Sequence, residues 1–217
     1  MWPIILALPI FGIFKTMAYF GPMKTLIIHP EDSTTTFLSQ IYAPLTYKTI
    51  IRGGISKSEL REQIELHDRV VMLGHGSPYG LLSQGQFPDA GLLIIDDSMV
   101  LTLKNKRDNV YIWCHADQFV QRHRLTGLNS GMFISEGMEA NYYDFDNMDW
   151  ELIEQSNDRF AAIFSKYLNE PMEILYQKLL YDYELIARTN PIARFNLARL
   201  YLTCSGTNRN PIRVVAI

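Results

Sequence analysis

Two apolar runs of the chain each end on a residue suited to nucleophilic or acid–base chemistry. Residues 70–74 read Val-Val-Met-Leu-Gly and lead into His75, and residues 110–113 read Val-Tyr-Ile-Trp and lead into Cys114. In open α/β sheets, ligands bind outside the carboxyl ends of the strands, so we expect the imidazole and the thiol to meet at one site. A thiol beside an imidazole is a cysteine nucleophile with its own base.

Gly76, the residue after His75, adds a candidate oxyanion donor to this hypothesis. An unaided thiol has a pKa of about 8.5 and is only slightly ionised at neutral pH, so a nearby imidazole matters. Gly76 allows the backbone to approach a ligand closely. The backbone N–H groups of Gly76 and Cys114 are therefore candidates for an oxyanion hole.

The elements that must position these residues alternate along the chain. Short apolar runs alternate with amphipathic stretches, which is typical of an α/β fold with a mostly parallel sheet and crossover helices. We expect strands at 25–29, 47–51, 69–74, 110–113 and 131–135, a small hairpin at 79–82 and 92–95, and helices at 56–67, 116–124 and 148–168.

Three segments make up the predicted domain organisation. Residues 23–170 form the α/β domain, and residues 171–217 form a helical C-terminal extension packed on the same domain, with helices at 171–187 and 192–202. Residues 1–22 are an apolar N-terminal extension. The first strand opens directly after Met23, so we expect Met23 to be the true start; a membrane anchor or an atypical export signal is the alternative.

Composition excludes several classes of function. The 217 residues are 47% hydrophobic and 20% charged, as in an ordinary globular protein, and the net charge of −3 with no basic block argues against nucleic-acid binding. The two cysteines, Cys114 and Cys204, show neither a disulfide framework nor metal-ligand spacing. We expect no cofactor and no metal, and a reducing, cytoplasmic compartment if the chain starts at Met23.

The two strand-end segments resemble one family of enzymes. Val-Val-Met-Leu-Gly-His-Gly-Ser at 70–77 and Val-Tyr-Ile-Trp-Cys-His-Ala at 110–116 are similar to the caspase-like cysteine peptidases, which include caspases, legumains, gingipains, clostripain and separase. The resemblance covers residues 24–145. It implies a caspase-like three-layer α-β-α sandwich with His75 as base, Cys114 as nucleophile, and the Gly76 and Cys114 amides holding the oxyanion.

The same resemblance indicates a substrate pocket. In this fold the strand after the nucleophile borders the pocket, so Ser135, Glu136 and Asp117 are expected to line it. A Glu136 side chain that points inward favours a basic P1 residue in a peptide or protein substrate. His115 departs from the family, because several members have Arg, Gln or Ser after the cysteine.

Two other functions remain open from the sequence. One is a non-catalytic caspase-fold module with a vestigial dyad, in which the C-terminal helices offer a contact surface for partners or for self-association. The other is metal binding, because Leu-Gly-His-Gly-Ser at 73–77 resembles the metal-binding segment of class II tetrapyrrole chelatases. That segment normally lies at the first strand, with a second histidine in the other half of the chain, and no histidine follows His123.

Overall fold

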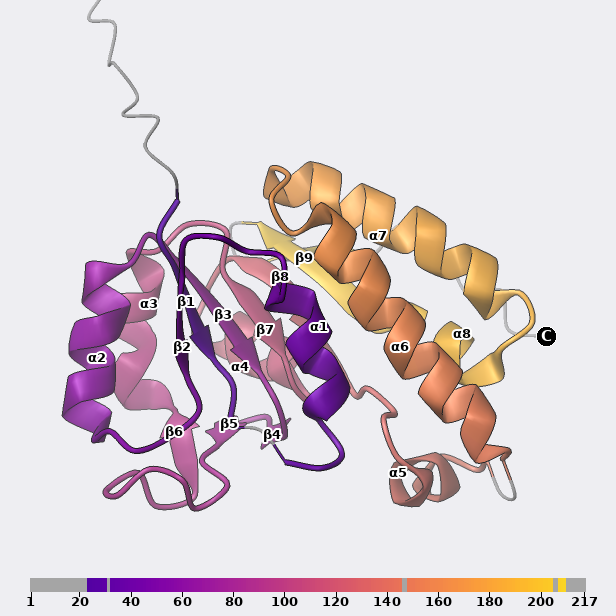
Figure 1. The fold of residues 1–217 in the computed structure, drawn as a ribbon, viewed down its shortest axis with the longest axis horizontal. Helices are drawn as coiled ribbons and strands as arrows, with labels where there is room; N and C mark the ends of the chain where they lie inside the picture. The colour runs from indigo at the N-terminus through magenta and orange to yellow at the C-terminus, as the bar shows by residue number, and fades with distance from the viewer. Residues whose placement is uncertain (1–22, 31, 146–147, 205–206, 210–217) are drawn as a thin grey trace, which may run out of the picture.

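The fold is built on one twisted sheet, seen in a computed structural model that describes residues 23–30, 32–145, 148–204 and 207–209 (Figure 1). The strand order is β10-β9-β8-β7-β3-β1-β2. The strands β2, β1, β3, β7 and β8 are parallel, whereas β9 runs antiparallel to β8 and β10 antiparallel to β9. Their bounds are β1 Thr25–Ile28, β2 Lys48–Ile51, β3 Arg69–Leu73, β7 Val110–Ile112, β8 Gly127–Ser130, β9 Leu200–Cys204 and β10 Thr207–Arg209.

Helices cover both faces of this sheet and make it the middle of three layers (Figure 1). The short helices α2, α3 and α4 lie on one face, and α1 with the long helices α6 and α7 lies on the other. Their bounds are α1 Ser39–Tyr42, α2 Lys57–Leu66, α3 Val100–Lys104, α4 Ala116–Arg122, α5 Gly137–Tyr142, α6 Trp150–Tyr167, α7 Met172–Ala187 and α8 Pro191–Leu197, with single 3-10 turns at Thr36–Leu38 and Asp97–Met99. The predicted α/β class with a mostly parallel sheet is confirmed.

Alternation along the buried strands divides the interior into two cores. Successive side chains of a strand point to opposite faces of the sheet. In β1, Ile27 packs into the core under α6 and α7, which contains Phe160 and Phe164. Its neighbours Leu26 and Ile28 pack into the core under α2, α3 and α4. The strands β1 and β3 are buried along their whole length, which explains their unbroken apolar runs.

A second, smaller sheet lies at the carboxyl end of the parallel strands, below the central sheet in Figure 1. It has the order β4-β5-β6 and consists of Gly76–Ser77, Gly80–Leu82 and Leu93–Ile95. Its first strand starts directly after His75. The expected hairpin is therefore present, with one further strand that connects it to the end of β3.

Local signals fix two of the helix starts. Ser56 precedes α2 and accepts a hydrogen bond from the Glu59 N–H, while the Glu59 carboxylate accepts one from the Ser56 N–H, which is the reciprocal capping box. Asn190 precedes α8 and accepts from the Ala193 N–H, with Pro191 at the first helical position. Both segments carry their helix start in the sequence itself.

Two predicted elements were wrong. The fifth strand is Gly127–Ser130 and not 131–135, and the helix expected over 192–202 ends at Leu197. The strand β9 follows at Leu200–Cys204 and pairs with β8. The C-terminal region 171–217 is thus not purely helical, because β9 and β10 extend the central sheet.

The physical reason is that neither segment has a decisive local pattern. Leu128 is the sole large apolar residue of β8. The polar residue Asn129 is also buried, and its side-chain amide donates 2.7 Å to Thr203 Oγ1 on β9. Leu200 and Leu202 alternate with Tyr201 as in a strand, but Leu197, Leu200 and Tyr201 also have the three- and four-residue spacing of a helix.

The expectation for residues 1–22 lies outside the described residues. Within the part of the chain that the structure describes, no helix combines the length and the apolar character needed to cross a membrane.

Candidate active site

The register between β3 and β7 determines how the strand ends that carry His75 and Cys114 are aligned. Met72 lies opposite Tyr111 and Leu73 opposite Ile112 in this parallel pair. The Gly74 N–H donates 3.1 Å to the Ile112 carbonyl, which continues the pairing beyond the strand. Counting on by two residues from Leu73 and Ile112, His75 and Cys114 are the corresponding positions at neighbouring strand ends.

Close packing between the two strand ends supports this arrangement. A Cβ atom on Gly76 would lie 2.1 Å from Trp113 Cδ1, so only glycine fits beneath the indole. The Trp113 side chain is fully buried, and its Nε1–H donates 3.1 Å to the Ser77 carbonyl. Gly76, which follows His75, and Trp113, which precedes Cys114, therefore fix the two strand ends to each other.

The His75 side chain is partly exposed and contacts the loop that follows β1. Its Nε2 atom lies 2.7 Å from Thr34 Oγ1 and 3.2 Å from Asp32 Oδ2. Asp32 is not among the site residues predicted from the sequence. A third parallel strand thus contributes to the site through the loop at its carboxyl end.

Two oxygens on the segment after β8 lie within hydrogen-bond distance of the Cys114 thiol, which can donate its single hydrogen to either. They are the Phe133 carbonyl at 3.6 Å and Glu139 Oε1 at 3.4 Å. Burial raises the pKa of the Cys114 thiol to about 12, and the negative charge of Glu139 acts in the same direction. The cysteine of this structure is a neutral thiol, and no hydrogen bond among the described residues joins it to His75.

Neither candidate oxyanion donor has a backbone partner in the part of the chain that the structure describes. No described residue accepts a hydrogen bond from the Cys114 N–H. The Leu82 N–H donates 2.9 Å to the His75 carbonyl, and Gly76 lies opposite Leu81 in the next pair. Hydrogen-bonded and non-hydrogen-bonded pairs alternate in an antiparallel ladder, so the Gly76 N–H does not point into the hairpin.

A sharp turn presents the cysteine at the end of β7. His115 has φ +65°, in the left-handed region, and the Ala116 N–H donates 3.2 Å to the Trp113 carbonyl across the turn. A non-glycine residue in this region carries backbone strain, which is found preferentially at functional sites. The turn leads directly into α4 and leaves Cys114 between strand and helix.

The structure places two of the three predicted pocket residues beside the thiol and the imidazole. Ser135 donates its N–H (2.7 Å) and its hydroxyl (3.0 Å) to Glu139 Oε2, on the carboxylate that also accepts from Cys114. Glu136 is within electrostatic range of both His75 and Cys114. Burial and the neighbouring Glu139 raise the pKa of Glu136 above its ordinary value.

The third predicted pocket residue, Asp117, lies elsewhere. It sits in the first turn of α4, and the ionisable side chains that interact with it are those of His115 and Tyr201 rather than the candidate dyad. Burial raises its pKa, and no described residue donates a hydrogen bond to its Oδ1 atom.

The sequence interpretation missed three residues that contact the dyad: Asp32, Thr34 and Glu139. Asp32 had one usable signal, because it follows a buried parallel strand closely, as His75 and Cys114 do. Glu139 lies in the short helix α5 and carried no signal, since its contact with Cys114 spans 25 positions of sequence.

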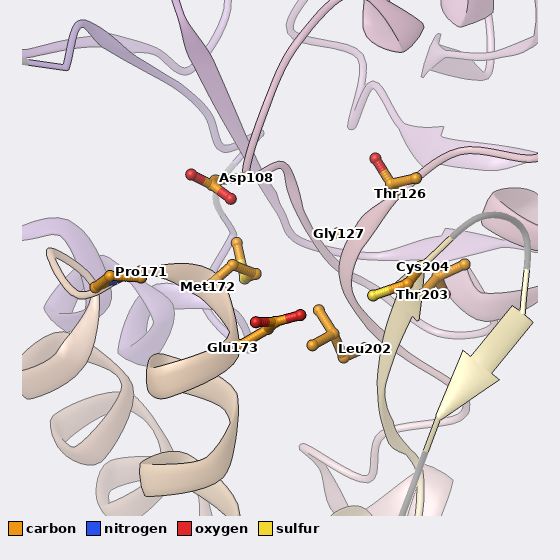
Figure 2. A pocket seen from close by; sticks show the side chains of 9 residues that line it. All are labelled: Asp108, Thr126, Gly127, Pro171, Met172, Glu173, Leu202, Thr203 and Cys204. Carbon is orange, nitrogen blue, oxygen red and sulfur yellow. The ribbon is translucent and has the colours of Figure 1, made fainter. Parts of the chain in front are cut away.

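Two cavities of the structure lie away from His75 and Cys114. A cavity of about 430 Å³ lies at the opposite end of the sheet, where Asp108, Gly127 and Cys204 are among its lining residues (Figure 2). A larger cavity, about 630 Å³, lies beside α8. Among the described residues, no group of three His, Cys, Asp or Glu side chains is arranged to hold a metal ion.

Comparisons with known proteins do not indicate a function for this chain. No family model, curated protein sequence or solved structure gives a significant match to this chain. The class that the structure defines is an α/β protein with a mostly parallel sheet, carrying a histidine and a cysteine at adjacent strand ends.

Proposed function

We propose that the protein is a cysteine endopeptidase with a caspase-like three-layer α-β-α sandwich, in which His75 and Cys114 form the catalytic dyad. The β3–β7 register carries this proposal, because it sets the two residues at corresponding positions beyond neighbouring parallel strands. A base and a nucleophile at one strand edge are what acyl transfer by a cysteine requires.

The proposed reaction uses the groups already described. Cys114 Sγ attacks the carbonyl carbon of the scissile bond while its proton passes to His75. The Gly76 and Cys114 N–H groups stabilise the oxyanion that forms. His75 then protonates the leaving amine as the C–N bond breaks, and water hydrolyses the acyl-enzyme to release the acid and the free thiol.

The raised pKa of the thiol fits a proton transfer that occurs during attack. A resting thiolate would need a nearby positive charge, whereas Glu139 is negative and accepts a hydrogen bond from Cys114. Catalytic hydrogen bonds are often long or absent before substrate binds. The dyad of this proposal is therefore assembled by substrate, which displaces the thiol from Glu139.

Charge around the dyad favours a substrate with a basic P1 side chain. The site contains three carboxylates close enough to interact. Asp32 and Glu139 act electrostatically on Glu136, and Glu136 and Glu139 act on Cys114. No lysine or arginine among the described residues forms an ion pair with Glu136, and its partial burial makes an unpaired charge costly. A lysine or arginine of the substrate supplies the missing cation.

The test is turnover of a fluorogenic peptide library that varies P1, using wild-type protein beside Cys114→Ala and His75→Ala. We expect hydrolysis after Arg or Lys by the wild type and loss of turnover by at least a thousandfold in both variants. Circular dichroism and thermal unfolding serve as the control that the variants are folded. Equal turnover by wild type and Cys114→Ala would refute the proposal.

One observation favours a second candidate function, a non-catalytic interaction module of the same fold. The thiol is held protonated by burial and by Glu139 rather than activated. Folded wild-type protein without turnover on the whole P1 library, together with a Cys114 that iodoacetamide does not label even with peptide present, would support that function.

A further inference from the structure

The contact between His75 and the loop after β1 defines a third functional residue. Two oxygens face the Nε2 atom of the ring: Thr34 Oγ1 at 2.7 Å and Asp32 Oδ2 at 3.2 Å. A carboxylate is only an acceptor. The Thr34 hydroxyl donates its own hydrogen to Asp32 Oδ1 at 2.8 Å, so it also acts as an acceptor toward the ring.

This arrangement determines the tautomer of the imidazole. Two acceptors facing Nε2 require that Nε2 carries the hydrogen. In a neutral imidazole the other nitrogen then has the lone pair. No described residue makes a hydrogen bond with His75 Nδ1, which leaves it available for a proton.

Asp32 is well suited to hold the ring because its own position is fixed. Its Oδ1 atom accepts from the Thr34 N–H (2.9 Å), the Thr35 N–H (3.1 Å) and both threonine hydroxyls. Burial raises the pKa of Asp32, but the hydrogen bonds from Thr34 and the charge of His75 outweigh this and leave the net pKa below its ordinary value. Asp32 is therefore ionised at neutral pH.

We propose that Asp32 is a positioning residue for His75, which holds the proton on Nε2 and so presents Nδ1 to the thiol and the leaving group. The role rests on the proposed peptidase function. Nδ1 takes the proton that Cys114 loses on attack, Asp32 stabilises the resulting imidazolium through Nε2–H, and Nδ1 returns the proton to the amine. Among the described residues, the carboxylate of Glu136, which precedes α5, also acts electrostatically on His75.

The substitution Asp32→Asn tests this role directly. The backbone N–H groups of Thr34 and Thr35 keep the side-chain oxygen of Asn at the Oδ1 position, because only an acceptor fits there. The amide NH₂ must then occupy the Oδ2 position and donate to His75 Nε2. The variant thus retains the turn but forces the hydrogen onto Nδ1, where it blocks proton acceptance.

Two measurements read out the effect. Long-range ¹H–¹⁵N correlation spectra, with His75 assigned by the His75→Gln variant, are expected to show the Nε2–H tautomer in wild type and Nδ1–H in Asp32→Asn. For the best peptide substrate we expect kcat to fall by roughly 10²- to 10⁴-fold, the range of comparable Asp→Asn changes, with KM within about threefold. The lower pKa in the pH profile of kcat/KM should also shift, which a purely structural change would not produce.

A second Asp–His pair provides the matched control. Asp97 Oδ1 lies 2.9 Å from His123 Nε2, and no hydrogen bond or ion pair among the described residues joins either of them to His75 or Cys114. Asp97→Asn should leave kcat and the His75 spectrum unchanged. A wild-type His75 in the Nδ1–H form, or an Asp32→Asn protein with the wild-type tautomer or kcat, would overturn the role of Asp32. Absence of wild-type turnover with the expected tautomer change would instead overturn the peptidase and leave the positioning of the ring established.

Discussion

The indole of Trp113 lies directly over the backbone of Gly76, so that an added Cβ would come within 2.1 Å of Trp113 Cδ1 and 2.8 Å of the Gly80 carbonyl oxygen. These two residues flank the proposed nucleophile and base. Their contact sets the separation of the two strand ends, because neither the buried indole nor the hairpin carbonyl has room to move.

Gly76→Ala should therefore destabilise the protein. Forcing extra volume into a packed site costs about 1–3 kcal/mol, which for a chain of this size lowers Tm by roughly 3–10 °C. Differential scanning calorimetry measures the change. Gly137→Ala is the control, because no atom lies within 4 Å of its added Cβ. Equal Tm values for the two variants would contradict the packing argument.

Alkylation of Cys114 should report the raised thiol pKa. Burial and the Glu139 charge raise this pKa to about 12, so thiolate is scarce at neutral pH. In a Cys204→Ala background, we expect the iodoacetamide rate to rise about tenfold per pH unit from pH 7 to 10 without a plateau, whereas a free cysteine levels off above a pH of about 9. Urea-unfolded protein is the control, and a folded-state plateau near neutral pH would disprove the prediction.

Removing the charge next to the thiol should increase its reactivity. Glu139→Gln keeps a side-chain oxygen for the Ser135 N–H but loses the negative charge that raises the Cys114 pKa. The thiol pKa then falls, and alkylation at pH 8 should speed up by roughly tenfold, as expected for one charge a few ångströms away. Glu154→Gln, an exposed change in α6, is the matched control. A slower reaction in Glu139→Gln would contradict the sign of this effect.

Glu136 should determine P1 preference if the proposed peptidase is correct. Glu136→Gln removes a half-buried carboxylate that forms no ion pair with a lysine or arginine of the described residues. We expect kcat/KM for Arg and Lys substrates to fall by roughly 10- to 100-fold, or about 1.4–2.7 kcal/mol of transition-state binding. Substrates with a neutral P1 residue of similar length should change by less than threefold. A uniform loss over all substrates would instead mark Glu136 as structural.

Asn196 should stabilise the segment that carries the Cys114 contacts. Its side chain accepts from the Ile134 N–H at 2.7 Å and donates to the Ile134 carbonyl at 2.9 Å, and it is fully buried. Asn196→Ala leaves two buried backbone groups unpaired and should cost about 2–4 kcal/mol in urea unfolding. Asn105→Ala at an exposed position is the control. A cost below about 1 kcal/mol would show that Ile134 finds other partners.

The sequence by itself determined the central strands and the candidate dyad. The runs ending at His75 and Cys114 form β3 and β7, within a residue or two of the expected bounds, because strands buried on both faces need continuous apolar side chains. The helix start at Ser56 was equally visible, since a capping box depends only on residues three apart.

The tertiary structure alone decided the features that depend on contacts between distant segments. β8 is a strand because it pairs with β7 and β9, and β9 is a strand because it pairs with β8, rather than because of their own composition. The contacts of His75 with Asp32 and of Cys114 with Glu139 join residues 43 and 25 positions apart, counted from their numbers, and no local pattern encodes them. The protonation of the thiol follows from burial and a neighbouring charge, both of which exist only in the folded chain.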